Sequence, residues 1–395
     1  VKQCRREMTD TLVYEKKSNL ARLAILEDGV LQEVEYVDEA KASEGSIYLG
    51  KITHKLELAH EKTGFFVDIK DGKDAFLMAE EHGMGESNIQ EGQSLLVQVS
   101  QERRAEKGAK LVRSIQLVGE NIVYCPYRMD VGASSRIENK EKLDEYRRKV
   151  IENTTGQEGW ILRTSSVDVP FEVIGEEMAA LRATFESVMK KARNVSAPAL
   201  LYAKGSPLYD AIGHYAKSLK RIVVNNHNLE EELKTKYGDI YEIEYQADPF
   251  EEAGLEDEIY EALNKVIYLP DGGRVIIEEA RACTAIDVDS GDDHGNGGIS
   301  RLNNEAAVEI AKQIRLRNLS GKIIIDFAGS SDYRFMKPVL EILEQELRKD
   351  PTKSSVLGLS RAGNVEIVRV RRRPSLSDIL TEECECCQGT GRVCK

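Results

Sequence analysis

The sequence lacks the features that would place it in a membrane or mark it for export. No apolar run among its 395 residues reaches the length of a membrane span. The first ten residues, VKQCRREMTD, have no apolar core of the kind that a signal peptide needs. We therefore expect a cytoplasmic protein with no membrane span.

Several familiar catalytic and nucleotide-binding motifs are also missing. The chain has no nucleophile elbow, no Walker phosphate loop, and no dinucleotide fingerprint between a strand and a helix. The loop GDDHGNGG at 291–298 resembles a phosphate loop only in its glycine content, and we interpret His294 within it as a loop residue rather than a base. The candidate site therefore has to be sought among other residue types.

The chain does not carry an excess of positive charge. Its 55 Lys and Arg residues are outnumbered by 68 Asp and Glu, which gives a net charge of −13. This charge argues against a protein coated with nucleic acid, because phosphate binding is largely electrostatic. It is compatible with a local basic groove. Short basic runs occur at 102–110, 315–317 and 369–373, and each alone is typical of a solvated charged face.

The composition indicates a folded protein of several domains. Hydrophobic residues make up 41% of the chain and charged residues 31%, a balance typical of globular proteins. The length of 395 residues predicts two to four domains. The fold class that we predict is a multi-domain protein with both α/β and β parts.

The first 118 residues have the pattern of short β-strands. Alternating apolar residues on both sides of Asp28-Gly29 predict a hairpin within 11–36. About five short strands then predict a small barrel of the OB type. Aromatic and cationic residues flank its strands: Phe65, Phe66, Phe76, Lys51, Lys107 and Lys110.

Aromatic rings beside cations on a small barrel often hold single-stranded nucleic acid. The alternative is that the phenylalanines fill the barrel. Phe65 and Phe66 are adjacent, so in a regular strand they face opposite ways and one of them must point out of the core.

The pattern changes after residue 118. A charged helix is predicted at 139–154 and a long helix at 175–195, and between them a strand runs into Arg163-Thr164. Three strands separated by short helices are predicted in 200–265, which is an α/β pattern.

A β-α-β unit is predicted in the last third of the chain. The stretch TAIDVD, the helix after it and IIIDF form a crossover that makes parallel strands. Asn303 is predicted to cap the helix. The buried face of this helix is predicted to hold Ala307, Ile310, Ala311 and Ile314.

Three aspartates cluster at the ends of these two strands. Asp287 and Asp289 alternate, so both carboxylates share one face and need a positive partner or water. Asp287 and Asp326 are predicted near the carboxyl ends of neighbouring strands, where α/β sheets usually hold ligands. Convergent carboxylates suit a hard divalent cation, usually Mg²⁺. The alternative is that each aspartate merely caps a turn or a helix.

Cysteine is unevenly spread. Four of the seven cysteines fall in the last dozen residues: Cys384, Cys386, Cys387 and Cys394. In a reducing compartment this clustering indicates metal rather than disulfides. Cys384-x-x-Cys387 followed by glycines is typical of a zinc knuckle and supplies two of the four ligands that zinc needs. The others are either the two remaining tail cysteines or the same pair from a second chain. A redox or idle tail is the alternative.

Five stretches, in this order, carry a resemblance to a known family: GSIYLGKIT, WILRTSS, IDVDSG, IIIDF and CECCQGTG. With this order and spacing the chain resembles the catalytic half of the ribonuclease E/G family of bacterial endoribonucleases over nearly its whole length. The resemblance implies these segments: 1–42 and 200–265 as an RNase H-like body, 43–118 as an S1-type OB domain, 119–199 as a 5′-phosphate sensor, 266–378 as a DNase I-like catalytic domain, and 379–395 as a zinc-link tail.

The resemblance also implies a function. It is Mg²⁺-dependent cleavage of single-stranded RNA, favouring 5′-monophosphorylated ends, in rRNA and tRNA processing and mRNA decay. Asp287 and Asp326 would bind the catalytic Mg²⁺, and Asp289 occupies the position that orients the attack. At this position the family usually has Asn, so the chain adds a negative charge beside the metal.

Further roles follow from the resemblance. Phe66 and Phe76 match aromatics that stack on RNA, and Lys107 matches the nearby cation. Arg163 and Thr164 match the pair that grips a 5′-monophosphate. The Cys384 and Cys387 pair matches a link in which two chains share one Zn²⁺, which implies a homodimer.

The chain departs from the family elsewhere too. IDFAGSSD lacks the second aspartate of the usual motif, and Cys386 is extra. The sequence ends just after the zinc motif, so we expect no tetramer-forming domain and no degradosome scaffold region. Two alternatives stay open: a non-catalytic RNA-binding paralogue, and a zinc-linked structural dimer.

Overall fold

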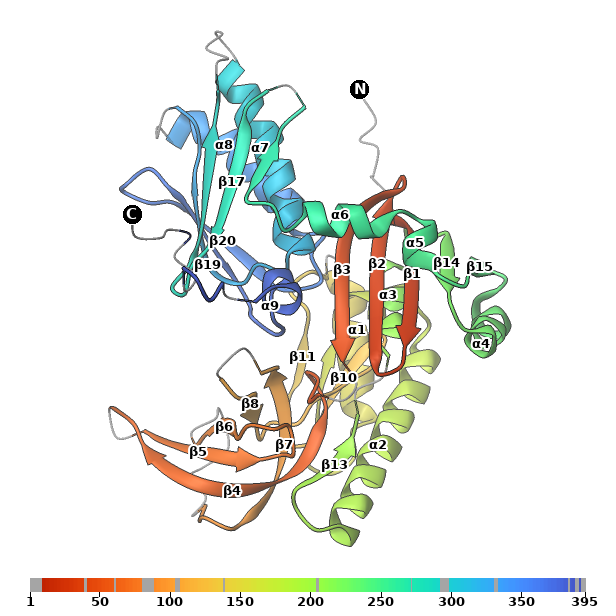
Figure 1. Cartoon of the computed structure of the whole chain (residues 1–395). Helices are drawn as coiled ribbons and strands as arrows, with labels where there is room; N and C mark the ends of the chain where they lie inside the picture. Colours follow the sequence, from red (N-terminus) through yellow and green to blue (C-terminus); the bar gives the residue numbers. More distant parts are fainter. Residues whose placement is uncertain are drawn as a thin grey trace. The chain divides into compact units, whose positions relative to one another are not determined.

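The computed structural model divides into two compact units. It describes residues 9–38, 41–59, 62–79, 89–103, 107–137, 139–203, 206–270, 272–291, 298–329, 333–382, 384–387 and 391. One unit comprises Val1–Asp38 and His214–Lys395, and the other Glu39–Gly213 (Figure 1). Within the described ranges no helix combines the length and apolar character needed to cross a membrane.

A closed five-stranded barrel opens the Glu39–Gly213 unit and confirms the predicted small barrel. Its strands are β4 (Ile47–Glu57), β5 (Thr63–Asp68), β6 (Ala75–Met78), β7 (Ser94–Gln101) and β8 (Lys110–Val112). They follow the order β4-β5-β6-β8-β7, and β4 also pairs with β7, which closes the ring. Alternate side chains such as Ile52, Phe65, Val67 and Leu77 fill the interior.

A four-stranded sheet and two long helices follow the barrel in this unit. The elements are β9 (Leu117–Val118), β10 (Ile122–Cys125), β11 (Val131–Ala133), α1 (Lys140–Glu152), β12 (Gly159–Leu162), the 3-10 helix η2 (Thr164–Asp168) and α2 (Phe171–Asn194). The strand order is β11-β12-β10-β9. Trp160 of β12 is fully buried against Tyr124 of β10, so both predicted helices flank a compact core.

The strand β13 (Ala199–Tyr202) pairs antiparallel with β4. Of the three strands predicted in 200–265, this one therefore lies in the sheet of the barrel. The other two are β14 (Arg221–Val224) and β15 (Glu242–Tyr245), and they pair in a sheet of the other unit.

That sheet has the order β15-β14-β1-β2-β3. The strands β1 (Thr9–Lys17), β2 (Leu20–Glu27) and β3 (Val30–Asp38) form the predicted N-terminal hairpin and its extension. Asp28 and Gly29 both have positive φ, the conformation that a tight two-residue hairpin turn requires. The helices α4 (His227–Tyr237), α5 (Pro249–Glu252) and α6 (Leu255–Glu261) belong to the same unit as this sheet, whereas α3 (Pro207–Tyr215) lies mostly within Glu39–Gly213.

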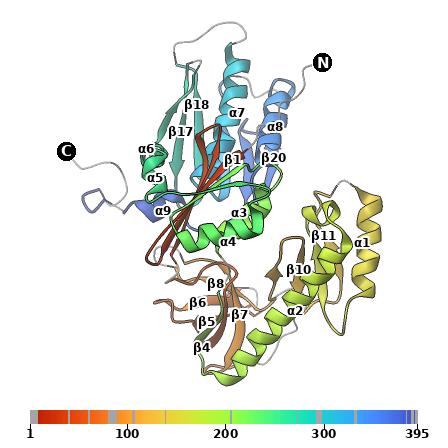
Figure 2. The same cartoon turned by 90° about the vertical axis from the view of Figure 1, so that its right-hand side faces the viewer.

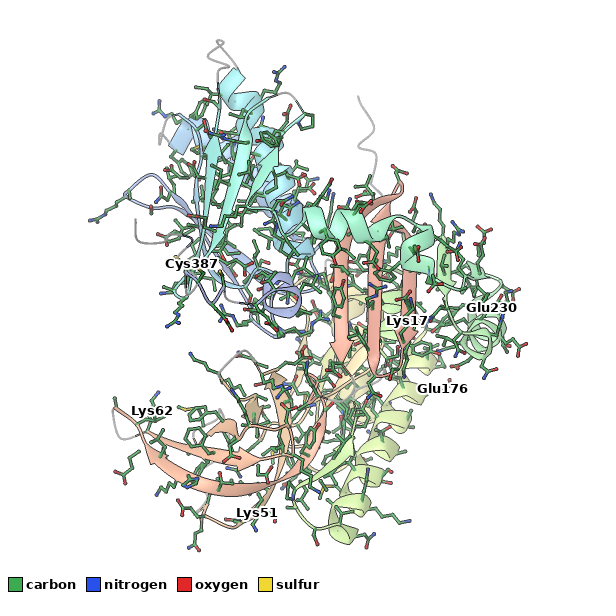
Figure 3. The ribbon with its side chains drawn as sticks, in the orientation of Figure 1. Lys17, Lys51, Lys62, Glu176, Glu230 and Cys387 are labelled. Atoms are coloured by element: carbon green, nitrogen blue, oxygen red, sulfur yellow. The ribbon has the colours of Figure 1, made fainter. Side chains whose placement is uncertain are left out.

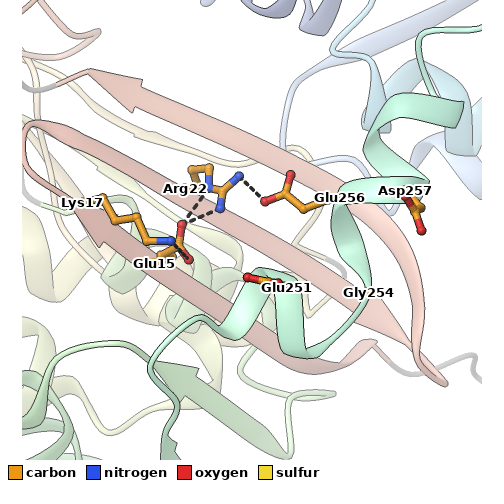
Figure 4. A pocket seen from close by; sticks show the side chains of 7 residues that line it. All are labelled: Glu15, Lys17, Arg22, Glu251, Gly254, Glu256 and Asp257. Atoms are coloured by element: carbon orange, nitrogen blue, oxygen red, sulfur yellow. Dashed lines mark hydrogen bonds and ion pairs between the residues drawn. The ribbon is translucent and has the colours of Figure 1, made fainter.

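A cavity of about 320 Å³ lies beside β1, β2 and the α5–α6 turn (Figure 4). Its charges pair with one another: Arg22 donates to Glu15 at 3.0 Å through Nε and to Glu256 at 2.8 Å. The Lys17 ammonium lies 3.2 Å from Glu15 and 2.7 Å from Asp248. These ion pairs fasten α6 to the hairpin, so we assign the cavity a structural role.

The second sheet of this unit has six strands, in the order β16-β17-β18-β19-β21-β20. They are β16 (Val266–Tyr268), β17 (Arg274–Glu279), β18 (Thr284–Asp289), β19 (Gly321–Asp326), β20 (Ser354–Leu359) and β21 (Val365–Arg369). The helices α7 (Gly298–Leu316) and α8 (Tyr333–Leu347) cover one face (Figures 1 and 2). The opposite face, here called the open face, exposes alternate residues such as Asp287 and Asp326.

The parallel pairing of β18 with β19 confirms the predicted β-α-β unit. The predicted apolar face of α7 is also confirmed, because Ala307, Ile310, Ala311 and Ile314 are all buried. The helix cap predicted at Asn303 is wrong. The helix begins five residues earlier, at Gly298, because burying Leu302 against the sheet favours the longer helix. Asn303 lies inside it, fully buried, and donates its side-chain N–H to Ala328 O at 2.9 Å.

A short helix, α9 (Leu376–Leu380), precedes the cysteine tail. It begins with a capping box: the Ser375 hydroxyl accepts from Asp378 N, and the Asp378 carboxylate accepts from Ser375 N. Leu376 is buried in the core that β1–β3 and α7 share. The backbone that leads into the tail is thus fixed to the body of its unit.

Candidate active site

The end of strands β18 and β19 brings two carboxylates side by side. Asp287 and Asp326 are direct register neighbours on this parallel pair. Neighbouring strands lie about 4.8 Å apart. Both side chains are exposed on the open face. The structure thus places Asp287 and Asp326 together, as the β-α-β pattern predicted.

Electrostatics at this pair favour the arrival of a cation. Partial burial raises the pKa of Asp287, and the nearby Asp326 and Asp289 carboxylates raise it further, against a lowering by Arg274. Among the residues that the structure describes, neither Asp287 nor Asp326 has a hydrogen-bond or ion-pair partner in the protein. A positive ion between them relieves this repulsion.

The third aspartate is held differently. Asp289 lies on the open face too, and its Oδ2 accepts from Arg274 Nε at 2.9 Å and from Nη2 at 2.6 Å. Its Oδ1 accepts from Gly291 N at 3.0 Å. These contacts lower the pKa of Asp289, the Gly291 N–H most strongly and the Arg274 guanidinium next. Arg274 is thus the positive partner that the alternation of Asp287 and Asp289 called for.

Arg274 is a site residue that the sequence analysis missed. It lies on β17 directly opposite Asp289 in an antiparallel pair. The signal was available in the sequence, because the short turn between Glu279 and Thr284 fixes the register of the hairpin. Counting outward from that turn leads to Arg274 and Asp289 as partners.

The donors at this edge fit Mg²⁺. Mg²⁺ is often bound through one or two carboxylates, with waters and substrate phosphates filling its octahedron. Asp287 and Asp326 supply two exposed carboxylates in register. Among the described residues no group of three or more His, Cys, Asp or Glu side chains converges as a closed metal cage. Two carboxylates leave the other positions of the octahedron to waters and phosphate oxygens.

The barrel presents an aromatic pair on its surface. Phe66 on β5 is 37% exposed, while its neighbour Phe65 is 2% exposed and lies in the core. The prediction that one of the two points outward is confirmed. Phe66 stands directly across from Phe76 on β6, and their ring centroids are 6.0 Å apart in an edge-to-face arrangement. Lys107, just before β8, is exposed in the same unit.

Arg163 and Thr164 lie together where β12 runs into η2. The Arg163 guanidinium donates to the carbonyl oxygens of Gly119 and Glu120, which fixes its orientation. The Thr164 hydroxyl lies 3.2 Å from the Ser134 hydroxyl, which the sequence analysis had not singled out. One guanidinium and two hydroxyls are donors that a phosphate can accept from.

The cysteine tail is described in part. Cys384, Cys386 and Cys387 are not joined in a disulfide, whereas Cys394 lies outside the described residues. Hydrogen bonds from the backbone of Cys387 and Cys386 lower the pKa of the Cys384 thiol, and the Cys387 side chain adds to this. Cys387 is labelled in Figure 3. A thiol whose thiolate is favoured by backbone amides is suited to metal binding.

A sheet edge with two exposed carboxylates suits a divalent cation, and a small barrel with an aromatic pair on its surface is typical of proteins that bind single-stranded nucleic acid. The ribonuclease E/G family model matches residues 116–372. Ribonuclease G of Escherichia coli (strain K12) is 32% identical over 419 residues, covering 98% of this chain and 85% of that protein. The chain belongs to the ribonuclease E/G family.

Other relatives agree. Ribonuclease G of Haemophilus influenzae is 31% identical over 418 residues, covering 95% of this chain and 82% of that protein. Ribonuclease E of Escherichia coli (strain K12) is 29% identical over 374 residues, covering 88% of this chain but 35% of the longer relative.

Proposed function

We propose that this protein is an endoribonuclease that uses Mg²⁺ to cut single-stranded RNA and favours 5′-monophosphorylated ends. The observation that carries the proposal is the in-register pair Asp287 and Asp326, exposed at the end of two parallel strands in a ribonuclease E/G family member. Processing of rRNA and tRNA and decay of mRNA are the pathways in which such an activity acts.

Asp287 and Asp326 would hold the ion in this proposal. When bound, Mg²⁺ supplies a water activated for attack on a phosphodiester and neutralises charge that develops on the phosphate. Asp289 is held by Arg274 and Gly291, so it acts as an oriented acceptor beside the pair rather than as a third ligand. It is suited to accept a hydrogen bond from the attacking water and so to orient it.

Substrate binding is proposed for the other unit. Phe66 and Phe76 offer ring faces and edges on which bases stack, with Lys107 for the backbone phosphates. Arg163 and Thr164 are proposed to bind a 5′-monophosphate, supported by the orientation that backbone carbonyls impose on the guanidinium. The domain roles implied by the family resemblance, RNase H-like, S1-type, sensor and DNase I-like, belong to this proposal.

We also propose that Cys384 and Cys387 bind Zn²⁺ jointly with the same residues of a second chain. The support is the pair of described thiols within one turn, one of them with a lowered pKa. A shared tetrahedral site needs two ligands from each chain, which this spacing supplies.

The test is cleavage of 5′-monophosphorylated single-stranded RNA in Mg²⁺ by the unaltered protein and by Asp326→Asn. We expect the substitution to lower the rate at least about 100-fold, because one of two ion ligands is lost. Glu366→Gln is the matched control, since Glu366 is an exposed carboxylate on the open face one strand away.

The outcomes separate the candidates. Binding of RNA without cleavage by the unaltered protein would favour the non-catalytic RNA-binding paralogue. Equal cleavage by Asp326→Asn and Glu366→Gln would contradict the metal assignment while leaving the nuclease intact.

A further inference from the structure

The open face carries three aspartates whose partners differ. Asp287 and Asp326 have no hydrogen-bond partner within the described part of the chain, whereas both oxygens of Asp289 are engaged. Three carboxylates on two adjacent strands place three negative charges where an RNA phosphate must approach. A positively charged side chain beside these carboxylates would lower the net negative charge.

Arg274 supplies this positive charge. It is the cross-strand neighbour of Asp289, and its Nε and Nη2 both bond to the same oxygen, at 2.9 and 2.6 Å. The backbone before it is fitted closely to the same residue. Gly273 has φ +78°, and a Cβ there would lie 2.8 Å from Asp289 O and 2.6 Å from a methyl group of Leu302. The start of β17 is thus shaped to bring Arg274 against Asp289.

We propose that Arg274 is a positioning residue of the candidate active site. With Asp289 it forms one neutral, oriented unit, and this unit keeps the strand edge at two net negative charges, so that an RNA phosphate can approach Asp287 and Asp326. The inference rests on the proposed function, since it concerns RNA at the same edge.

The geometry of the guanidinium supports this charge balance. Two of its five N–H donors bond to Asp289, so the positive charge lies directly against that carboxylate. The side chain is 44% exposed, so its charge acts at the surface that a phosphate would approach. Without Arg274, the Asp289 charge would stand uncompensated two residues along β18 from Asp287, about 7 Å away, inside the range over which charges act at physiological salt.

The experiment is a charge cycle read by RNA binding. Affinity for 5′-monophosphorylated single-stranded RNA is measured without added Mg²⁺ for the unaltered protein, Arg274→Gln, Asp289→Asn and the double variant. We expect Arg274→Gln to weaken binding about fivefold, because it exposes one carboxylate charge. Asp289→Asn should strengthen binding, and the double variant should return to within about twofold of the unaltered protein. The KM for cleavage in Mg²⁺ should rise by a similar factor in Arg274→Gln.

The rescue distinguishes charge balance from a structural contact. A role in holding the sheet together would be lost in the double variant as well, and melting temperatures of all four proteins check this. The matched control is Lys265→Gln with Glu278→Gln, which removes an exposed ion pair at 3.2 Å between β17 and the residue before β16 and should leave affinity unchanged.

Two results would overturn the inference: Arg274→Gln binding RNA as the unaltered protein does, or the double variant binding as weakly as Arg274→Gln. Failure of the proposed function looks different. In that case the unaltered protein does not cleave RNA in Mg²⁺. The order of the four RNA affinities still tests the role of Arg274. Absence of RNA binding by all four proteins would overturn both proposals.

Discussion

At the scale of single residues, two adjacent phenylalanines of the barrel lie in different environments. Phe65 and Phe66 are consecutive on β5, yet the first lies in the barrel core and the second on its surface. The alternation of side chains along a strand produces this division. Two neighbouring substitutions of the same type should therefore have different consequences.

Phe66→Ala should weaken binding of single-stranded RNA about 10-fold and leave the melting temperature nearly unchanged. The reason is that stacking of one base on an aromatic ring contributes about 1–3 kcal/mol. Phe65→Ala should instead lower the free energy of unfolding by about 3–5 kcal/mol, since it removes a buried ring. Fluorescence anisotropy with labelled RNA and thermal melts measure the two effects. A loss of stability in Phe66→Ala equal to that in Phe65→Ala would contradict the division.

The sequence predicted the residues that follow from local rules. Asp287 and Asp326 were placed correctly at neighbouring strand ends, because a β-α-β crossover makes parallel strands. Arg274 was not found, since its significance depends on which residue faces it across the hairpin, and a search for motifs along the chain does not show that. The structure thus added the partner of Asp289 rather than the carboxylates themselves.

At the scale of secondary-structure elements, one ion pair joins α2 to β12. Glu158 precedes β12 and accepts from Arg182 of α2 through Nη2 at 2.6 Å and from Thr155 N at 2.8 Å. Burial tends to raise the pKa of Glu158, but the hydrogen bonds from Arg182 and Thr155 outweigh it and lower the pKa. The ionised carboxylate therefore stabilises the packing of helix on strand.

Stability of this unit should depend on pH through Glu158. A carboxyl whose pKa is lowered in the folded state contributes stability above its unfolded pKa, which is about 4.3, and loses it as pH falls through the folded value. Glu158→Gln should thus lower the free energy of unfolding by about 1.5–3 kcal/mol near pH 7, the contribution of a hydrogen bond to a charged group. The difference from the unaltered protein should shrink below about pH 4. Urea unfolding at several pH values measures this, and a difference independent of pH would contradict it.

The sequence predicted most helices and strands correctly, but it did not predict all of the strand pairings. The helices at 139–154 and 175–195 appear as α1 and α2 with small shifts of their ends. The partner of β13 could not be predicted, because pairing with β4 joins residues about 150 positions apart in the chain. The start of α7 was misjudged for a related reason: the burial of Leu302 depends on a sheet assembled from distant strands, and it outweighs the local preference for a cap.

At the scale of the whole molecule, the tail determines the proposed assembly. The described thiols Cys384, Cys386 and Cys387 follow α9 directly in the chain, and α9 is anchored by its capping box and by Leu376. Because α9 is anchored, a zinc ion shared through Cys384 and Cys387 would join the folded parts of two chains rather than two unanchored tails.

Zinc removal should convert a dimer into monomers. The purified protein should contain about half an ion of zinc per chain, because two chains supply the four ligands of one site. Cys384→Ser and Cys387→Ser should each give monomers in sedimentation velocity, and so should treatment with a chelator. Cys283→Ser is the matched control outside the tail and should stay dimeric. One full zinc per chain, or dimers of Cys387→Ser, would contradict a shared site.

The anchored helix α9 also limits how far the zinc-binding cysteines can lie from the body of the chain. Leu380 ends the helix and Cys384 follows four positions later, a stretch that spans at most about 14 Å when fully extended. Two such segments meeting at one ion, with the cysteine side chains and Zn–S bonds included, would hold the helix ends of the partners within roughly 40 Å of each other. Each chain would then keep its partner's RNA-binding surface at a high effective concentration, so that a long transcript released by one copy meets the other before it diffuses away.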